Sequence, residues 1–138
     1  MGNVNILAVF LGALAFFAVG AVWYTVLFGK AWRELTGITD EMVKAGPRPG
    51  QNPTWLIMGL AFLFELLIAL TFGHMLARTN PSPHVVLMMA FGFGATIMAP
   101  AIGINYLYQM KPGKLFAIDA GYMVVGMLAM GGVFILLG

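Results

Sequence analysis

Residues 54–77 read TWLIMGLAFLFELLIALTFGHMLA and contain a single charged residue, Glu65. At about 1.5 Å per residue, a helix of this length extends roughly 35 Å, enough to cross a bilayer hydrocarbon core of about 30 Å. In lipid, a continuous apolar run this long satisfies its backbone groups only as a helix, whereas a β-barrel needs shorter alternating segments. The stretch therefore predicts a transmembrane helix.

Three further apolar runs of 23 or 24 residues have the same character. They are Asn5–Phe28, Val85–Tyr108 and Leu115–Leu137. The 138-residue chain is 61% hydrophobic and 9% charged and has no cysteine, whereas soluble domains carry about 25% charged residues. This composition excludes a cytosolic enzyme, a disordered chain and a disulfide framework, and a net charge of +2 gives no reason to expect a nucleic-acid partner. We predict an all-α membrane protein, a bundle of four transmembrane helices that forms one domain over residues 1–138, with membrane lipid as its surroundings.

The basic residues indicate how the chain is oriented. Six of the seven lie in the loops 29–53 and 109–114, namely Lys30, Arg33, Lys44, Arg48, Lys111 and Lys114, and the seventh is Arg78 on the opposite side. The positive-inside rule places both basic loops in the cytoplasm and both termini on the outer side.

The long loop 29–53 has two predicted parts. Lys30–Thr36 is expected to form a short interfacial helix, and Thr39 with Asp40 and Glu41 is typical of the start of a second one. Residues 46–53 form a cluster of glycines and prolines that ends regular structure. The short outer loop 78–84 predicts that the second and third spans are antiparallel neighbours.

Glu65 lies eleven residues from one end of its run and twelve from the other, at the bilayer midplane. A charge there costs at least about 2.5–3.5 kcal/mol, which makes Glu65 a candidate functional residue. Small residues precede and follow it at four-residue spacing and predict that it faces another helix: Ala61, Ala69, Gly73 and Ala77. Thr96 lies at matching depth and is a candidate hydrogen-bond donor. Two interpretations stay open: a carboxyl that binds a proton or cation, and a neutral glutamic acid that holds two helices together.

A second polar group is predicted near the cytoplasmic ends of the spans. Asp119, Asn105, Trp23 and Tyr24 lie within about 4–8 Å of a helix end. Tyr122 follows Asp119 by one turn, and Lys30 is long enough to reach this layer. The layer is either a small pocket open to the cytoplasm or a hydrogen-bonded tie between helices. We favour the tie, because aromatic residues are expected at the membrane interface.

The remaining features predict packing. Phe91, Ala95, Ala99 and Gly103 form a second ridge at four-residue spacing, and Pro100 is expected to kink the third span. His74 and His84 lack a third metal ligand, and we expect no metal and no cofactor. No nucleophile stands with a base and no phosphate-binding loop occurs, so the sequence favours a protein that is not an enzyme.

Two segments carry a family resemblance. The first segment closes the first span and reads Gly20-Ala-Val-Trp-Tyr24 followed by Leu27-Phe-Gly-Lys-Ala-Trp32. The second reads Asn105-Tyr-Leu-Tyr108 followed by Lys114-Leu-Phe-Ala-Ile-Asp-Ala-Gly-Tyr122. Both resemble the signatures of the bacterial membrane proteins catalogued as domain of unknown function 1761. The resemblance covers essentially the whole chain, including a last span punctuated by glycines such as Gly121. It implies four spans in a bacterial inner membrane and gives weight to the cytoplasmic layer, but it implies no activity. Thr25-Val26 departs from the Ser-Pro expected there, and Glu65 is not part of the expected family pattern.

Three functions compete at this point. The first is a non-catalytic packing or accessory protein that assembles with itself or joins a larger membrane complex. The second is an oligomeric channel or proton-linked transporter that uses Glu65 and Asp119. The third is a binder or enzyme for a lipid-soluble substrate, held by the aromatic and polar residues of the cytoplasmic layer.

Overall fold

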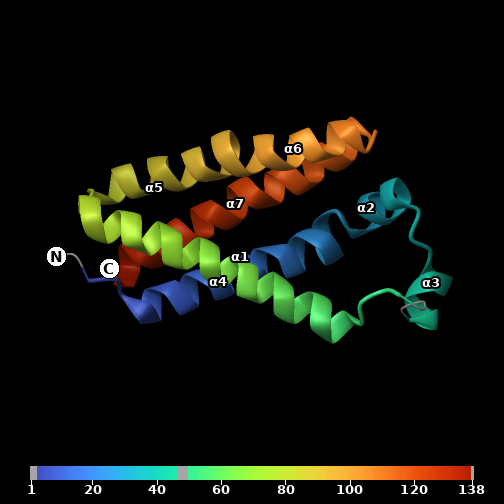
Figure 1. Cartoon of the computed structure of the whole chain (residues 1–138), viewed down its shortest axis with the longest axis horizontal. Coiled ribbons are helices and arrows are strands. Elements are labelled where there is room, and N and C mark those ends of the chain that lie inside the picture. Colours follow the sequence, from blue (N-terminus) through green and yellow to red (C-terminus); the bar gives the residue numbers. More distant parts are fainter. Residues whose placement is uncertain (1–2, 47–49, 138) are drawn as a thin grey trace.

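The computed structural model describes residues 3–46 and 50–137, and within them all regular structure is helical (Figure 1). Four helices in this part of the chain are long and apolar enough to cross a membrane. The predicted all-α class with four such helices is confirmed. The first consists of α1 (Ile6–Val22) and the π-helix η1 (Trp23–Leu27); the second is α4 (Thr54–Thr79); the third consists of α5 (Pro83–Gly92), the π-helix η2 (Phe93–Met98) and α6 (Ala99–Tyr108); the fourth is α7 (Gly113–Leu137).

The helix α7 is the centre of the bundle. It packs against α1 on one side and against α5, η2 and α6 on the other, while α4 packs mainly on α1. The second and third spans are antiparallel, as predicted. Their backbones pack mainly on other helices, α4 on α1 and the third span on α7. α4 contacts the third span through the Phe72 ring, which stands edge-on to Phe93 with the ring centroids 5.6 Å apart. Both described ends of the chain and the α4–α5 turn lie at one end of the bundle, and α2, α3 and the α6–α7 turn lie at the other (Figure 1).

The loop after the first span forms the two predicted helices. α2 (Gly29–Thr36) ends at Gly37, whose φ of 76° favours glycine. α3 (Asp40–Ala45) is capped by Thr39, whose hydroxyl accepts the Met42 amide hydrogen at 3.2 Å. An ion pair of 2.6 Å between Arg33 and Asp40 joins α2 to α3. Of the predicted glycine and proline cluster, residues 47–49, including Arg48, lie outside the described residues.

The core lies where α7 meets α1, α4 and α5, and its largest fully buried side chains are Phe16, Phe72, Met127 and Met130. Close approach requires glycine at Gly94, because a Cβ there would lie 2.7 Å from the Val124 Cα. The outside of the bundle is apolar, with Trp55 74% and Leu107 80% exposed. A bilayer would cover such a surface, whereas water would not favour it.

The third span corrects the predicted ridge. Its buried face runs through Val86, Ala90 and Gly94 at four-residue spacing and then moves five residues to Ala99. The extra residue belongs to η2, where the turn widens because Pro100 offers no amide hydrogen to the preceding turn. Phe91 is consequently 52% exposed, so its place on the ridge was wrong.

Candidate functional site: a buried carboxyl–tyrosine network

Glu65 is buried on α4, with 7% of its surface exposed. Its Oε2 accepts a hydrogen bond of 2.6 Å from the hydroxyl of Tyr122 on α7. Its Oε1 is also buried and has no hydrogen-bond partner in the described part of the chain. One carboxyl oxygen is therefore held by a hydrogen bond, and the other can still bind a proton or accept a hydrogen bond.

Tyr122 lies where three helices meet. Its phenol oxygen is 2.6 Å from Glu65 of α4 and 3.2 Å from the main-chain oxygen of Phe16 in α1. One hydroxyl hydrogen serves only one of these two acceptors at a time. Gly20 provides the space for the phenol, because a Cβ at this position would lie 2.7 Å from the Tyr122 hydroxyl oxygen.

Asp119 is equally buried, with 7% exposed, but both of its oxygens are occupied. Oδ1 accepts a hydrogen bond of 2.5 Å from the Tyr24 hydroxyl of η1, and Oδ2 accepts one from the Tyr106 hydroxyl of α6. No basic side chain pairs with it: the ion pair found over residues 3–46 and 50–137 is Arg33–Asp40. Asp119 therefore ties the first, third and fourth spans together, as the favoured interpretation of this layer predicted.

The two carboxyls belong to one continuous cluster. The rings of Tyr24 and Tyr122 stand edge to face, with their centroids 5.4 Å apart. Tyr24 bonds to Asp119, and Tyr122 bonds to Glu65. We call the five residues Glu65, Tyr122, Tyr24, Asp119 and Tyr106 the carboxyl–tyrosine network.

Trp23 fixes η1 against α7 beside this network. Its indole Nε1–H donates to the Ile118 main-chain oxygen at 2.8 Å. The indole fits against α7 because residue 121 is glycine: a Cβ on Gly121 would lie 2.8 Å from the Trp23 ring. At the end of the third span, the Lys111 ammonium lies 4.8 Å above the Tyr106 ring, a cation–π contact.

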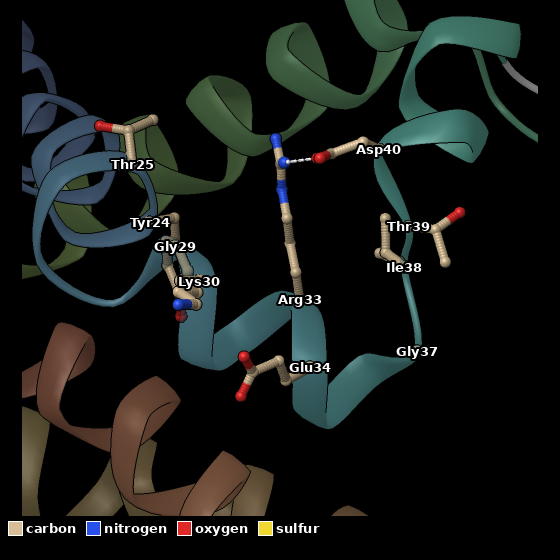
Figure 2. A pocket seen from close by; sticks show the side chains of 10 residues that line it. All are labelled: Tyr24, Thr25, Gly29, Lys30, Arg33, Glu34, Gly37, Ile38, Thr39 and Asp40. Atoms are coloured by element: carbon tan, nitrogen blue, oxygen red, sulfur yellow. Dashed lines mark hydrogen bonds and ion pairs between the residues drawn. The ribbon is translucent and has the colours of Figure 1, made fainter.

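A cleft of about 730 Å³ opens where the first span meets α2 and α3. Tyr24 lines it, together with charged side chains of α2 and the Arg33–Asp40 ion pair that crosses it (Figure 2). Lys30 lines this cleft and makes no ion pair with Asp119 in the described structure. The cleft brings polar surface to the edge of the network.

Two predicted site residues lie elsewhere. Thr96 is exposed on η2, and its hydroxyl donates to the Gly92 main-chain oxygen at 2.5 Å, so Tyr122 and not Thr96 is the partner of Glu65. Asn105 is exposed, and its neighbour Tyr106 points to Asp119 instead. Sequence reasoning missed Tyr106, although it follows the buried Ala99 and the half-buried Gly103 at the i, i+4, i+7 spacing of one helix face.

The predicted small residues pack inside the chain. Ala69 is fully buried, and Ala99 is 8% exposed. A Cβ on Gly73 would lie 3.2 Å from the Phe134 ring, and one on Gly103 would lie 3.0 Å from the Phe116 ring. Ala61 and Ala95 are half-buried. These ridges therefore accommodate helices and rings of the same chain.

The described residues contain no group of three histidine, cysteine, aspartate or glutamate side chains placed to hold a metal ion. Four long apolar helices around a buried polar network are the architecture of a multi-pass membrane protein. Residues 7–135 match the family described as "Protein of unknown function (DUF1761)", and the chain belongs to this family. The matched range includes all five residues of the network. No curated protein and no solved structure matches the chain.

Proposed function

We propose that this chain is a proton-linked membrane transporter in which Glu65 takes up and releases the proton. The observation that carries this proposal is the state of the Glu65 carboxyl: it is buried, Tyr122 occupies one oxygen, and the other oxygen has no partner among the described residues. An ionised carboxylate in that position lacks both a counter-ion and half of its hydrogen bonds, which is costly at low dielectric. Binding a proton removes the charge.

The comparison with Asp119 explains why Glu65 carries this role. Both residues are 7% exposed. Asp119 receives one tyrosine hydroxyl on each oxygen, an arrangement that stabilises the carboxylate and joins helices. Glu65 receives one hydroxyl, and its other oxygen has no partner within residues 3–46 and 50–137. Of the two buried acids, Glu65 is the one whose surroundings leave a place for an exchangeable proton.

We further propose that the chain lies in a bacterial inner membrane with both termini on the outer side. Five described basic residues gather at the end of the bundle that carries α2, α3 and the α6–α7 turn: Lys30, Arg33, Lys44, Lys111 and Lys114. Arg78 lies near the α4–α5 turn, at the end where the described termini lie (Figure 1). This asymmetry supports a cytoplasmic location for the basic end.

A second candidate is the packing or accessory role, in which the chain assembles with itself or with a larger membrane complex. The Asp119 tie favours it, because two tyrosine hydroxyls on one buried carboxylate make a stable joint between three spans. The small-residue ridges do not add support, since their contacts lie within the chain. A lipid-soluble ligand at the cytoplasmic layer is less favoured, because Asp119 and Trp23 already have partners there.

Flux measurements in proteoliposomes distinguish these roles. The purified protein is reconstituted with a pH-sensitive dye inside, and proton movement is followed after a pH step, with and without a membrane potential. We expect proton flux in the parent protein and at least a tenfold loss in Glu65→Gln. Glu41→Gln is the matched control, because Glu41 is an exposed acid on α3. Equal flux in Glu65→Gln and the parent, or no flux in the parent under any gradient, would overturn the proposal.

A further inference from the structure

Resting on the proposed function, we infer that Tyr122 is a proton-dependent hydrogen-bond switch that transmits the state of Glu65 to the first span. While Glu65 is ionised, the Tyr122 hydroxyl donates to it. When Glu65 is protonated, the same hydroxyl donates to the main-chain oxygen of Phe16 in α1. Proton binding on α4 is thereby linked to the contact between α7 and α1, and this gives a proton-linked transporter a way to couple its proton to helix packing.

The distances at the Tyr122 hydroxyl correspond to the first of these two states. Its oxygen lies 2.6 Å from Glu65 Oε2 and 3.2 Å from the Phe16 oxygen. Hydrogen bonds from a hydroxyl to an oxygen usually span about 2.5–3.0 Å. The contact with Glu65 lies inside this range and the contact with Phe16 lies outside it, so the hydroxyl hydrogen points to Glu65. An ionised carboxylate keeps it there, because charge-assisted hydrogen bonds are roughly twice as strong as neutral ones.

The position of the proton on Glu65 follows from the two carboxyl oxygens. A hydrogen on Oε2 meets the Tyr122 oxygen 2.6 Å away. Oε1 is buried and has no hydrogen-bond partner within residues 3–46 and 50–137. This geometry favours Oε2 as the protonated atom, because a hydrogen there keeps the bond between the two residues. Oε1 then becomes the carbonyl oxygen of a neutral acid, which tolerates burial better than a carboxylate oxygen does.

Proton uptake reverses the direction of the hydrogen bond and leaves Tyr122 a phenol. The Glu65 carboxylate gains one proton on Oε2, and the new acid donates it to the Tyr122 oxygen. The tyrosine keeps its own hydrogen, which turns about the ring carbon–oxygen bond toward Phe16, since a phenol accepts and donates at the same time. The Phe16 oxygen accepts the Gly20 amide hydrogen inside α1 and has a second lone pair for the phenol.

The result is a chain of hydrogen bonds from α4 through α7 to α1 that is complete while the proton is bound. The distance between the Tyr122 and Phe16 oxygens is expected to shorten from 3.2 Å into the ordinary range. Gly20 makes this approach possible, because a Cβ there would lie 2.7 Å from the Tyr122 hydroxyl oxygen. The Phe16 and Tyr122 rings already stand edge to face, with centroids 4.9 Å apart. Proton binding therefore tightens α1 against α7.

The titratable groups that face the switch come from three elements. α4 contributes Glu65, and η1 contributes Tyr24, whose ring lies 5.4 Å from that of Tyr122. α7 contributes Asp119, whose oxygens accept from the Tyr24 and Tyr106 hydroxyls. α1 has no titratable side chain over Ile6–Val22. Titration of Asp119 is therefore the competing source of a pH effect, and it persists when Glu65 is replaced by glutamine.

Infrared difference spectra between low and high pH, recorded on the full chain in lipid vesicles, follow both halves of the switch. The carboxylic-acid band that is lost in Glu65→Gln reports protonation of Glu65. Ring-labelled tyrosine identifies the phenol carbon–oxygen band, whose frequency depends on whether the hydroxyl donates, accepts or does both. We expect one tyrosine component to shift together with the Glu65 band in the parent protein and to be absent in Glu65→Gln. Glu41→Gln is the matched control and is expected to keep both, because Glu41 is an exposed acid on α3.

Two tyrosine variants assign the shifting component. Tyr122→Phe is expected to remove it. Tyr108→Phe is expected to leave it unchanged, because Tyr108 is 85% exposed. If Tyr122→Phe does not fold, the comparison of the parent protein with Glu65→Gln and Glu41→Gln still decides the result.

A carbonyl label identifies the acceptor on α1. In protein labelled with carbonyl-¹³C phenylalanine, protonation of Glu65 is expected to lower the frequency of one labelled carbonyl. Phe16→Leu keeps the main-chain oxygen but removes its label, so this component is expected to vanish while the tyrosine shift remains. Phe17→Leu is the control, because Phe17 is the half-buried next residue of α1 and its substitution leaves the Phe16 label in place.

Three results would each overturn the switch: a Glu65 band that titrates without a tyrosine shift, a tyrosine shift that persists in Glu65→Gln, or a carbonyl component that survives Phe16→Leu. In the first and third cases Glu65 still binds a proton, and in all three the proton flux decides the proposed function separately. A parent protein with neither a pH-dependent Glu65 band nor proton flux would overturn the proposed function and the switch together.

Discussion

The phenol oxygen of Tyr122 lies 2.6 Å from Oε2 of Glu65, and this contact joins the middle of α4 to α7. The two residues are 57 positions apart in the sequence. Because the backbone of α4 packs mainly on α1, this hydrogen bond is the polar link between the second and fourth spans among the described residues. The chemistry of Glu65 therefore depends on how α7 is positioned.

Removing the Tyr122 hydroxyl is predicted to destabilise the bundle. In Tyr122→Phe, Glu65 loses the hydroxyl that donates to its Oε2, and both of its buried oxygens are then without a partner among the described residues, which costs about 1–3 kcal/mol. The free energy of unfolding by SDS in mixed micelles measures this cost. Tyr108→Phe is the control, because Tyr108 is 85% exposed and is expected to show no change. Equal stability of the two variants would contradict the prediction.

The Asp119 tie is predicted to act as a unit. Tyr24→Phe and Tyr106→Phe each remove one hydrogen bond to the carboxylate, at a cost of about 1.5–3 kcal/mol for a bond to a charged group. In an Asp119→Ala background, either tyrosine substitution is expected to cost clearly less, with a coupling energy above about 0.5 kcal/mol. A double-mutant cycle of SDS unfolding measures the coupling. If the effects of the tyrosine and Asp119 substitutions were strictly additive, the tyrosine hydroxyls would not act through Asp119, and the prediction would be wrong.

Two glycines of the third span, two residues apart, are predicted to differ sharply. A Cβ at Gly94 would lie 2.7 Å from the Val124 Cα, so Gly94→Ala forces η2 away from α7 and is expected to cost about 1–3 kcal/mol. A Cβ at Gly92 meets nothing within 4 Å, so Gly92→Ala is expected to be neutral or slightly stabilising. Thermal unfolding in detergent, followed by circular dichroism, compares the pair. Similar midpoints for the two variants would be evidence against the close packing of η2 on α7.

Two polar residues of the third span are predicted to be dispensable. Thr96 bonds to its own helix, and Asn105 is exposed, so neither belongs to the carboxyl–tyrosine network. Thr96→Val and Asn105→Ala are expected to change the free energy of unfolding by less than about 0.5 kcal/mol and to leave proton flux as in the parent. A loss of flux in Thr96→Val would restore Thr96 as a partner of Glu65.

The depth of a residue in its span could be predicted from the sequence, but the partner across the helix interface could not. Counting along residues 54–77 placed Glu65 at the centre of its run, and the small residues around it predicted a buried face. Thr96 has matching depth by the same count. It points outward because the widened turn of η2 shifts the buried face of the third span from Gly94 to Ala99. A π-helical turn before a proline is a backbone conformation that the hydropathy of the sequence does not predict.

The layer of aromatic and acidic side chains near the α2–α3 end of the bundle illustrates the same limit. Trp23, Tyr24, Asp119 and Tyr122 were expected at one level, and the structure brings them together through α7. Asn105 was also expected there, but Tyr106 takes its place at Asp119. One residue along a helix rotates a side chain by about 100°, so the correct depth does not ensure the correct face.

Four apolar helices, the central position of Glu65 in its run and the concentration of basic charge at one end could all be predicted from the sequence, because length, hydropathy and charge are properties of single segments. Which oxygens have partners depended on the packing of the helices: Asp119 has both oxygens occupied, whereas Glu65 has one without a partner among the described residues. That difference arises from the rotation and spacing of four helices, which glycines such as Gly20 and Gly94 set by allowing close contact. Hydrogen bonds between distant spans form only where such packing brings a donor within about 3 Å of an acceptor.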